Sequence, residues 1–438
     1  MTGSEIVLAF SRSTESILFP MTNRQLRLSL LLVSLLAMLG FSSCTTMLDK
    51  ISNGIDDPAD RKAAMAQVPQ RDLDFHQSLF IADLHCDSLL WARDLMERHD
   101  FGHFDVPRMV EGNVSFQILA MPTEVPIKIG DKRIGNSVGI LTFLQEGRRM
   151  TNFERSIRAA DELDDLIARS ANTKNPIRLI ETKEDLRQFR RDYDAAPADQ
   201  RPIGTFLGLE GANGLDNEGP DDYTLDDVHN QIRKLWDRGY RTVSPAHFHG
   251  NDGIGAAQHP TDHDHGLSMV GLEALKEMER MGMVIDVTHA ARPAIEDIMT
   301  AWRAGELTRP IISSHTGVRP YMPRLRALPN RYLIDVATTG GVIGVSFFKN
   351  AKESMSVEEI ALSFRKIVDV LDTAGFNGID YVAFGSDYDG TVKVPFDVSE
   401  MVLLTSELRK PKYGFSDDDI RKIAGDNVYR VLLTTLPD

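Results

Sequence analysis

The chain has 438 residues, of which 42% are hydrophobic and 26% charged, so it contains ample material for a large buried core. Its 64 acidic residues outnumber the 49 basic ones, and the formal net charge of −15 argues against binding nucleic acid through its phosphates. Only two cysteines are present, Cys44 and Cys86, which excludes four-cysteine zinc sites and disulfide frameworks. Any metal ion must therefore be held by histidines and carboxylates.

The N-terminal region has the pattern of an export signal. An apolar run that ends at Phe41 is preceded by Arg24 and followed by Ser42, Ser43 and Cys44. The run is short for a membrane span, which needs roughly 20 apolar residues. A cysteine after small residues resembles a bacterial lipoprotein processing site, so we predict a protein of the bacterial cell envelope whose Cys44 is acylated. A soluble periplasmic protein cut near Ser43 and an uncleaved anchor are the alternatives.

The sequence predicts three regions. Residues 1–44 form the leader, for which Met21 is the better start. Residues 45–75 are polar and are predicted to be a tether between the anchor and the folded domain. Residues 76–438 show no further boundary and are predicted to be one hydrolase domain.

From about residue 80, eight apolar runs of strand type alternate with amphipathic helical patterns. Helical patterns cover 225–239, 271–282 and 356–375, and each ends in glycine, a common helix stop. Repeated strand–helix units imply parallel pairing, and eight units favour a single (β/α)8 barrel of the α/β class over an open doubly wound sheet. The predicted strands are Leu79–Leu84, Val114–Ala120, Ile203–Leu209, Tyr240–Ser244, Met283–Val287, Pro310–Ser313, Gly341–Phe347 and Tyr381–Phe384.

Side chains that can bind a metal ion recur where these predicted strands end. In a (β/α)8 barrel the C-terminal ends of the strands form the rim that carries the active site. A single histidine at a strand end is more often structural than functional, but six strands that end in this way indicate a site. The candidates are His85 and Asp87, Glu210, His247 and His249, His289, His315, and Asp387 and Asp389.

The spacing of the candidates favours a centre with two metal ions. His85 and Asp87 are two positions apart, so on a strand both face the barrel mouth, whereas Cys86 faces the helices and is predicted to be a small buried residue. Histidine and carboxylate ligands suit zinc or a similar first-row ion. With Glu210, His289 and His315 the set is too large for one catalytic zinc, but one shared carboxylate makes two three-ligand sites.

Other polar residues are weaker candidates. Asp389 precedes a glycine and has turn chemistry, so Asp387 is the better candidate at the end of the eighth strand. His259, His263 and His265 lie close together, but no predicted strand holds them, and we predict a solvated loop.

Taken together, the motifs resemble the renal or membrane dipeptidase family, a branch of the amidohydrolase-like metal barrels. The resemblance extends from about Phe80 to Leu433. It rests on DLHCD, LGLEG, SPAH, VIDVTH, ISSH, VAFGSDYDG and the closing IAGDNVYRVL. Cys86 stands where the family usually has asparagine, and no metal ligand is missing.

The resemblance implies two zinc ions per chain, with other divalent first-row ions as alternatives. It implies that His85 and Asp87 bind the first ion, that His289 and His315 bind the second, and that Glu210 bridges them. The implied reaction is hydrolysis of the peptide bond of dipeptides by a hydroxide between the two metals. Some members of the family accept a C-terminal D-residue, and the family tends to form homodimers.

The resemblance also implies roles in substrate binding and catalysis. His247 matches a substrate-binding histidine that can stabilise the oxyanion, and Asp387 matches an aspartate near the substrate amino group and the nucleophilic water. Arg326 matches the arginine that receives the substrate carboxylate, in a loop that also holds Arg319 and Arg324.

Three other functions remain open at this stage. Another metal-dependent amide or lactam hydrolase of the same superfamily is one, although many such enzymes bridge their metals with a carboxylated lysine at the fourth strand, which has none here. An enzyme that tailors one dedicated peptide is the second. The third is a non-catalytic binding lipoprotein, for which we would expect a lost ligand or acid–base residue.

Overall fold

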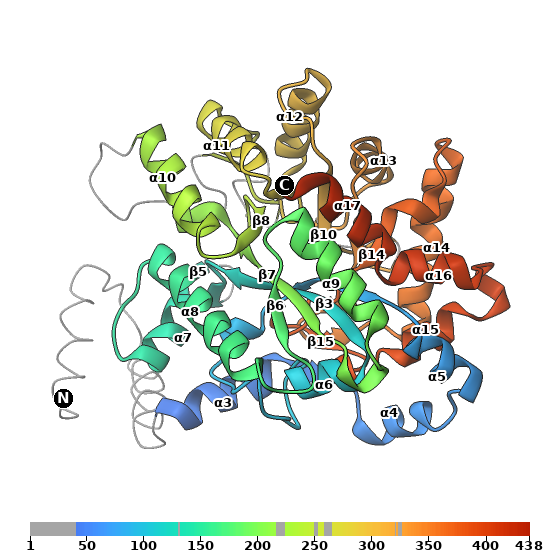
Figure 1. Cartoon of the computed structure of the whole chain (residues 1–438). Coiled ribbons are helices and arrows are strands. Elements are labelled where there is room, and N and C mark those ends of the chain that lie inside the picture. Colours follow the sequence, from blue (N-terminus) through green and yellow to red (C-terminus); the bar gives the residue numbers. More distant parts are fainter. Residues whose placement is uncertain are drawn as a thin grey trace.

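The computed structural model describes residues 41–129, 132–215, 224–248, 253–257, 265–319, 321–322 and 326–438. Within them, eight parallel strands close into a barrel in the bonded order β2-β3-β7-β8-β9-β10-β11-β14, with β14 returning to β2 (Figure 1). All eight predicted strands are present, and the predicted fold class is confirmed. The barrel strands are β2 (Ile81–Cys86), β3 (Val114–Pro122), β7 (Ile203–Glu210), β8 (Tyr240–Ser244), β9 (Val284–Asp286), β10 (Ile311–Thr316), β11 (Ile343–Val345) and β14 (Val382–Phe384).

Several short strands outside the barrel were not predicted. β6 (Ile177–Leu179) pairs in parallel with Ile203–Thr205, the start of β7, while β8 pairs with the later residues of β7. Two antiparallel hairpins lie in the loops. A further pair of two-residue strands includes one strand from the N-terminal region. These strands are β4 (Pro126–Ile129) with β5 (Lys132–Asn136), β12 (Phe348–Asn350) with β13 (Glu353–Ser354), and β1 (Gly54–Ile55) with β15 (Lys393–Val394).

Helices surround the strands on the outside of the barrel (Figure 1). Five of them, α8, α9, α10, α14 and α16, start with a capping box. In this motif a Thr or Ser side chain accepts a hydrogen bond from the backbone N–H three residues later, and the acidic side chain at that position accepts one from the backbone N–H of the Thr or Ser. The helices are α6 (Val106–Glu111), α7 (Ser137–Glu146), α8 (Asn152–Ser170), α9 (Lys183–Ala195), α10 (Leu225–Trp236), α11 (Met269–Arg280), α12 (Arg292–Arg303), α13 (Asn330–Thr338), α14 (Val357–Thr373), α15 (Val402–Leu408), α16 (Asp417–Arg421) and α17 (Asn427–Thr435).

The predicted glycine stops are present after three of these helices. Gly239, Gly282 and Gly375 follow α10, α11 and α14 with φ of 86°, 81° and 90°, the left-handed region that side chains other than glycine rarely adopt. These stops turn the chain back from each helix toward the next strand.

The barrel interior is apolar below the rim. Leu84, Ile118, Val284 and Ile312 belong to one buried cluster that also contains Val428, Val431 and Leu432 of α17. A second, larger cluster fills the space between the strands and the surrounding helices. The strands are thus fixed from both sides, which holds the side chains at their C-terminal ends in place.

Residues 45–75 differ from the predicted tether, because they fold against the barrel. They lie in α3 (Phe41–Ser52), β1, α4 (Pro58–Met65) and the first part of α5 (Gln70–Gln77), and Asp49, Asn53 and Asp72 are buried. The polar composition that suggested a tether instead supplies buried ion pairs and hydrogen bonds. No helix in the described part of the chain is long and apolar enough to cross a membrane.

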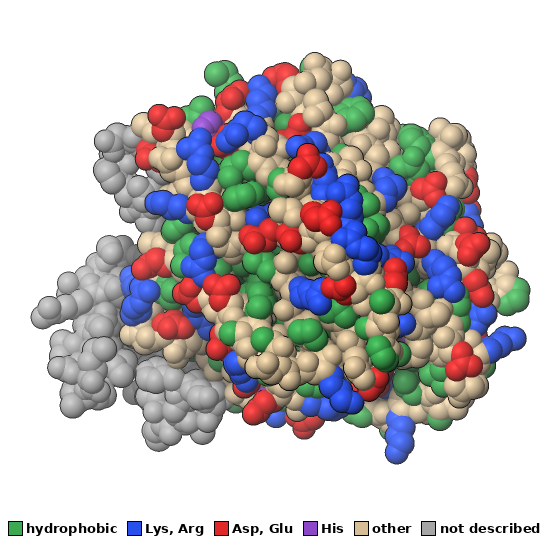
Figure 2. Space-filling model, viewed as in Figure 1, with side chains coloured by type: hydrophobic (Ala, Val, Ile, Leu, Met, Phe, Trp, Pro, Cys, Tyr) green, Lys and Arg blue, Asp and Glu red, His purple; other side chains and the backbone are tan. Residues whose placement is uncertain are grey.

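The outer surface carries both signs of charge. Figure 2 shows acidic and basic side chains interspersed on one face of the molecule. The net charge of −15 is therefore compatible with many local ion pairs, such as Arg238 with Asp161 and Asp164.

Candidate active site

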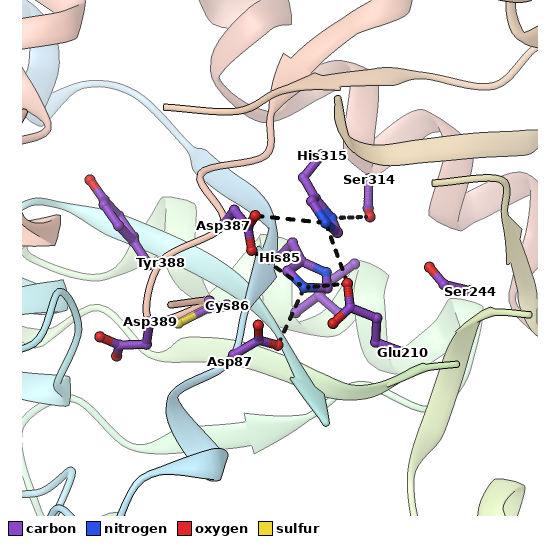
Figure 3. A network of polar contacts seen from close by, with 12 residues as sticks. His85, Cys86, Asp87, Glu210, Ser244, Ser314, His315, Asp387, Tyr388 and Asp389 are labelled. Carbon is purple, nitrogen blue, oxygen red and sulfur yellow. Dashed lines mark hydrogen bonds and ion pairs between the residues drawn. The ribbon is translucent and has the colours of Figure 1, made fainter. Parts of the chain in front are cut away.

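Side chains from the ends of the barrel strands converge at one place. His85 belongs to β2, Glu210 to β7 and His315 to β10, while Asp87 and Asp387 follow β2 and β14. Figure 3 shows these five side chains pointing toward one another. The register of β2 against β3 shifts between Asp83 and Cys86, a local irregularity of the kind that often accompanies active sites.

Glu210 lies at the centre of the cluster. Its Oε1 atom is 3.5 Å from Nε2 of His85, 3.1 Å from Nε2 of His289 and 3.4 Å from Nε2 of His315. Its Oε2 atom is 3.3 Å from Nε2 of His247. One carboxylate therefore faces four histidines.

The potential ligand atoms fall into three overlapping groups, each with all its atoms within 4.8 Å of one another. The groups are His85 with Glu210 and His315, Glu210 with His247 and His289, and His85 with Asp87 and Asp387. His247 and Asp387, predicted to bind substrate, thus lie within the same constellation as the five predicted ligands. Nε2 of His289 and of His315 are 3.1 Å apart, so one ion could contact both rings.

The electrostatics of the cluster suit cations. Burial raises the pKa of Glu210 well above its ordinary value, as does the neighbouring Asp87 carboxylate. Burial lowers the pKa of His289 and His315 far below the ordinary value, so both rings are neutral, the form that binds metals. His85 is the exception: burial lowers its pKa, but Glu210 and Asp87 outweigh burial and raise it to about 10.

Nε2 of His85 and Oδ1 of Asp87 are buried and form an ion pair with each other, but neither makes a hydrogen bond of normal geometry among the described residues. They lie 3.3 Å apart, and both are the kind of atom that coordinates zinc. Buried polar atoms are rarely left unpaired, and buried carboxylates are costly unless a positive charge neutralises them. The residues present therefore fit a bound divalent metal.

Asp387 is held in an unusual backbone conformation beside the cluster. Its φ is 61°, and His289 has a φ of 68°; such values are uncommon for residues other than glycine and concentrate at functional sites. Oδ1 of Asp387 is 3.9 Å from Nε2 of His85, and Oδ2 is 3.8 Å from Nη2 of Arg326. Burial raises the pKa of Asp387 to about 6, against the opposing effects of Arg326 and His85.

Arg326 reaches the site from the loop after β10. Its Nη2 donates a hydrogen bond to the carbonyl oxygen of His315 at 2.9 Å, and its guanidinium lies 5.2 Å from the centre of the Phe348 ring. Arg319 of the same loop is exposed, and Arg324 lies outside the described residues.

A set of polar residues that the sequence analysis did not single out supports the ligands from behind. The Ser314 hydroxyl contacts Nδ1 of His315 at 2.8 Å and donates to Asp286, which also accepts from the Ser244 hydroxyl. A hydroxyl held by a buried carboxylate fixes the ring orientation of a metal-binding histidine. Asp286 and Ser314 stand inside the motifs VIDVTH and ISSH, but the motifs do not indicate that the two side chains contact each other.

A second pair of a buried carboxylate and a serine hydroxyl is formed by Asp83 of β2 and Ser386, which follows β14. Ser386 donates to Asp83 through its hydroxyl at 2.6 Å and through its backbone N–H at 2.8 Å. The same hydroxyl contacts the carbonyl oxygen of His85 at 3.1 Å. The loop that carries Asp387 is thereby tied to the strand that carries His85.

The remaining candidates lie apart from this cluster or outside the described residues. Figure 3 shows Cys86 and Asp389 turned away from the histidines, and both are buried. His265 is exposed. The other predicted positions, His249, His259 and His263, lie outside the described residues.

Two fungal proteins are similar to this chain in sequence. "Dipeptidase tcpJ" of Claviceps purpurea is 26% identical over 340 residues, which covers 76% of this chain and 69% of that protein. "Dipeptidase verJ" of Clonostachys rogersoniana is 27% identical over 235 residues, 52% of this chain and 55% of that protein.

Solved structures share the fold. A metallopeptidase from Rhodobacter sphaeroides, liganded with a phosphinate mimic of the dipeptide L-Ala-D-Ala, superposes with a TM-score of 0.62 at 20% identity, covering 82% of this chain and 99% of that one. The probable dipeptidase PvdM from Pseudomonas aeruginosa gives a TM-score of 0.63 at 18% identity, covering 86% and 99%.

The sequence profile of the membrane dipeptidases, peptidase family M19, matches residues 70–435. That range contains every barrel strand and every residue of the buried cluster around Glu210. Relatives named dipeptidases and metallopeptidases of known structure agree with a hydrolase that acts on dipeptides. The chain therefore belongs to the membrane dipeptidase family.

Proposed function

We propose that this chain is a binuclear zinc dipeptidase and that Glu210 is the ligand shared by its two ions. The observation that carries the proposal is the position of Glu210 Oε1, within 3.5 Å of Nε2 of His85, His289 and His315. Asp87 completes one ligand set, and other divalent first-row ions are chemically acceptable to the same donors. When bound, two cations lower the pKa of a water between them, so that hydroxide is available near neutral pH.

The charged groups beside the ligands match the two ends of a dipeptide. The Arg326 guanidinium can receive the substrate carboxylate through two parallel hydrogen bonds, and the Asp387 carboxylate can bind the substrate ammonium. A site that pairs both termini favours dipeptides, because a blocked terminus leaves a buried charge without a partner.

We propose that two side chains act on the reacting bond. His247 lies in one group with Glu210 and His289, and its ring can donate a hydrogen bond to the oxygen of the tetrahedral intermediate. Asp387 can accept a proton from the attacking water and deliver it to the leaving amine, because its carboxylate faces the histidine cluster.

The stereochemistry of the second residue is a further part of the proposal. The Rhodobacter sphaeroides structure holds a mimic of L-Ala-D-Ala. We propose that this chain also accepts a D-residue at the C-terminal position, because the carboxylate clamp by Arg326 fixes the terminus and not the side chain.

A hydrolysis screen with metal content measured on the same samples tests these proposals. Protein purified without chelator should contain about two metal ions per chain and should hydrolyse L,L- and L,D-dipeptides. Glu210→Gln should lose both metal and activity. A firm value of one ion per chain that Glu210→Gln leaves unchanged would contradict the shared ligand. Absence of turnover on every dipeptide tested would contradict the dipeptidase function.

We further propose that the chain is exported and anchored in the cell envelope through Cys44. The support is the order of basic, apolar and small residues that ends at this cysteine.

A further inference from the structure

A segment before the family-matched region lies against the loop that carries Asp387. We define residues 49–56 as the N-terminal strap. It comprises the end of α3, β1 and Asp56, and it precedes residue 70, where the match to the family profile begins. Gly54 and Ile55 pair in parallel with Lys393 and Val394, and the Asp56 N–H donates to the Val394 carbonyl oxygen at 3.1 Å.

Asp389 is the buried residue at which this loop is fixed. Its carboxylate accepts hydrogen bonds from the backbone N–H of His103 at 2.7 Å and from the Ser88 hydroxyl at 2.6 Å, and it forms an ion pair with Arg93. Ser88 directly follows the predicted ligand Asp87. Asp389 therefore joins the loop that carries Asp387 to the loop that carries Asp87.

The strap reaches this same network from the outside. Oδ2 of Asp49 is 3.2 Å from Nε of Arg93, so the Arg93 guanidinium lies between Asp49 and Asp389. Nδ2 of Asn53 donates to Asp49 at 2.8 Å, while Oδ1 of Asn53 accepts from the Thr391 N–H at 3.0 Å. All of these side chains except that of Thr391 are buried, so water does not compete for the contacts.

A backbone carbonyl of the strap adds another link. Nε2 of His103 donates to the Gly54 carbonyl oxygen at 3.0 Å, and Nδ1 of the same ring accepts from the Asp389 N–H at 2.8 Å. This pair of contacts requires the neutral ring with its proton on Nε2. His103 thus connects the strap to Asp389 through the backbone of both.

The loop needs such support because its conformation is unfavourable by itself. Asp387, Asp389 and Thr391 have φ of 61°, 62° and 59°. All three are left-handed, and none of the three is a glycine. Residues held in sparsely populated backbone regions persist only where the surrounding structure fixes them. The contacts of Asp389 and Thr391 described above supply that constraint. The strap contacts Thr391 directly through Asn53 and is linked to Asp389 through Arg93 and His103.

We propose that the N-terminal strap is a positioning element for Asp387, acting through the contact of Asp49 with Arg93 and of Asn53 with the Thr391 N–H. The proposal rests on the catalytic role proposed for Asp387. It extends the active site of this chain to a segment outside the family-matched residues. Asp49 and Asn53 are positioning residues, because neither contacts the ligand cluster.

The decisive variant is Asp49→Asn, which keeps the size of the side chain and removes the charge that faces Arg93. We expect kcat for a dipeptide to fall about tenfold, because a small displacement of a catalytic group is costly, whereas KM and metal content change by less than about twofold. Hydrogen exchange of the backbone amides in residues 387–394 should become faster. Should this variant fail to fold, Asn53→Ala, which removes only the bonds to Asp49 and Thr391, carries the same expectations.

Asp72→Asn is the matched control. Asp72 is also a buried acid of the N-terminal region, and its Oδ1 pairs with Nη1 of Arg409 at 2.6 Å, but it joins α5 to α15 and not to the Asp387 loop. We expect this variant to lower the melting temperature while kcat and exchange at 387–394 stay at the wild-type value.

The outcomes separate this proposal from the proposed function. Unchanged kcat and unchanged exchange in Asp49→Asn would overturn the positioning role, and so would equal losses in Asp49→Asn and Asp72→Asn. If the wild-type protein hydrolysed no dipeptide, the proposed function would be wrong. The exchange comparison would then still decide whether the strap holds the loop.

Discussion

At the scale of single residues, Asp387 combines three properties that rarely occur together. It is buried, it has a left-handed backbone, and its carboxylate lies between a histidine cluster and Arg326. Burial raises its pKa to about 6 in the absence of metal, whereas nearby cations favour the ionised form. With cations bound, the carboxylate is therefore expected to be ionised, the form that can bind an ammonium group and accept a proton.

Replacing Asp387 by asparagine should separate catalysis from metal binding. Asp387→Asn keeps the size of the side chain, and the five predicted ligands remain. We expect near-normal metal content and a loss of turnover of about 100-fold or more, the usual scale for a general acid–base group. His289→Ala is the comparison and should lose metal and activity together. Metal analysis and dipeptide turnover on both variants decide the matter: full activity of Asp387→Asn, or metal loss equal to that of His289→Ala, would contradict the assigned role.

The carboxylate clamp gives a second prediction at this scale. In the wild-type protein, amidating the C-terminus of a dipeptide should lower kcat/KM by about 100-fold, because the buried Arg326 charge loses its partner. Arg326→Ala should act equally poorly on free and amidated dipeptides, while the exposed Arg319→Ala should behave as the wild type does. Measuring kcat/KM for both substrates checks this, and equal rates on them in the wild-type protein would argue against the clamp.

The sequence indicated which residues would meet but not how they are supported. His85, Glu210 and His315 could be predicted because the ends of parallel strands share one rim. Ser314 and Asp286 could not, because their contact with each other crosses from β9 to β10 and depends on the pairing register of those strands. Residues in long loops could not be predicted either, because a loop has no periodic pattern that indicates which of its side chains reaches the site.

At the scale of elements, the eight strands were predictable and the N-terminal helices were not. Continuous apolar runs mark strands that are buried on both faces, and each of the eight lies where the pattern placed it. β6 has only three residues and shows no pattern of its own. α4 contains no buried residue, so its composition resembles that of a tether although the segment is folded.

Helix α5 gives a prediction about pH and stability. His76 of α5 is buried, and its ring contacts the Thr405 hydroxyl at 2.8 Å and the Gly112 carbonyl oxygen at 2.9 Å. Burial lowers its pKa to about 4, against an ordinary value of 6.5, so the unfolded chain takes up a proton at a higher pH than the folded chain does. His76 should therefore not affect how the free energy of unfolding depends on pH above pH 6.5. As the pH falls from 6.5 toward 4, it should lower the free energy of unfolding progressively.

The variant His76→Gln isolates this effect. We expect the free energy of unfolding to fall less between pH 6.5 and 4 in the variant than in the wild-type protein, by about 3 kcal/mol. At neutral pH the variant should be somewhat less stable, because a glutamine cannot make both ring contacts. Urea unfolding at several pH values measures both quantities. Parallel curves for the two proteins would show that His76 does not titrate differently in the folded state.

At the scale of the whole molecule, the fold of α3 changes what an anchor at Cys44 would mean. Thr45 and Asp49 are buried, and the N-terminal strap pairs with β15, so few residues separate Cys44 from the body of the barrel. A lipid attached to Cys44 would therefore hold the barrel directly at the membrane surface, whereas a flexible tether would let it move away. The strap and the proposed anchor would then belong to one continuous segment.

Cys44→Ser tests the anchor. If Cys44 is acylated, the variant should move from the membrane fraction to the soluble periplasmic fraction. A protein that has been cut from its leader and carries no lipid has no remaining anchor in the membrane. The purified variant should retain dipeptide turnover, since the residues assigned to the site lie elsewhere in the fold. Fractionation with an assay of turnover in each fraction measures both effects, and Cys86→Ser controls for the loss of a thiol. Unchanged membrane association of Cys44→Ser would identify an uncleaved apolar helix as the anchor, and a wild-type protein found only in the soluble fraction would contradict anchoring altogether.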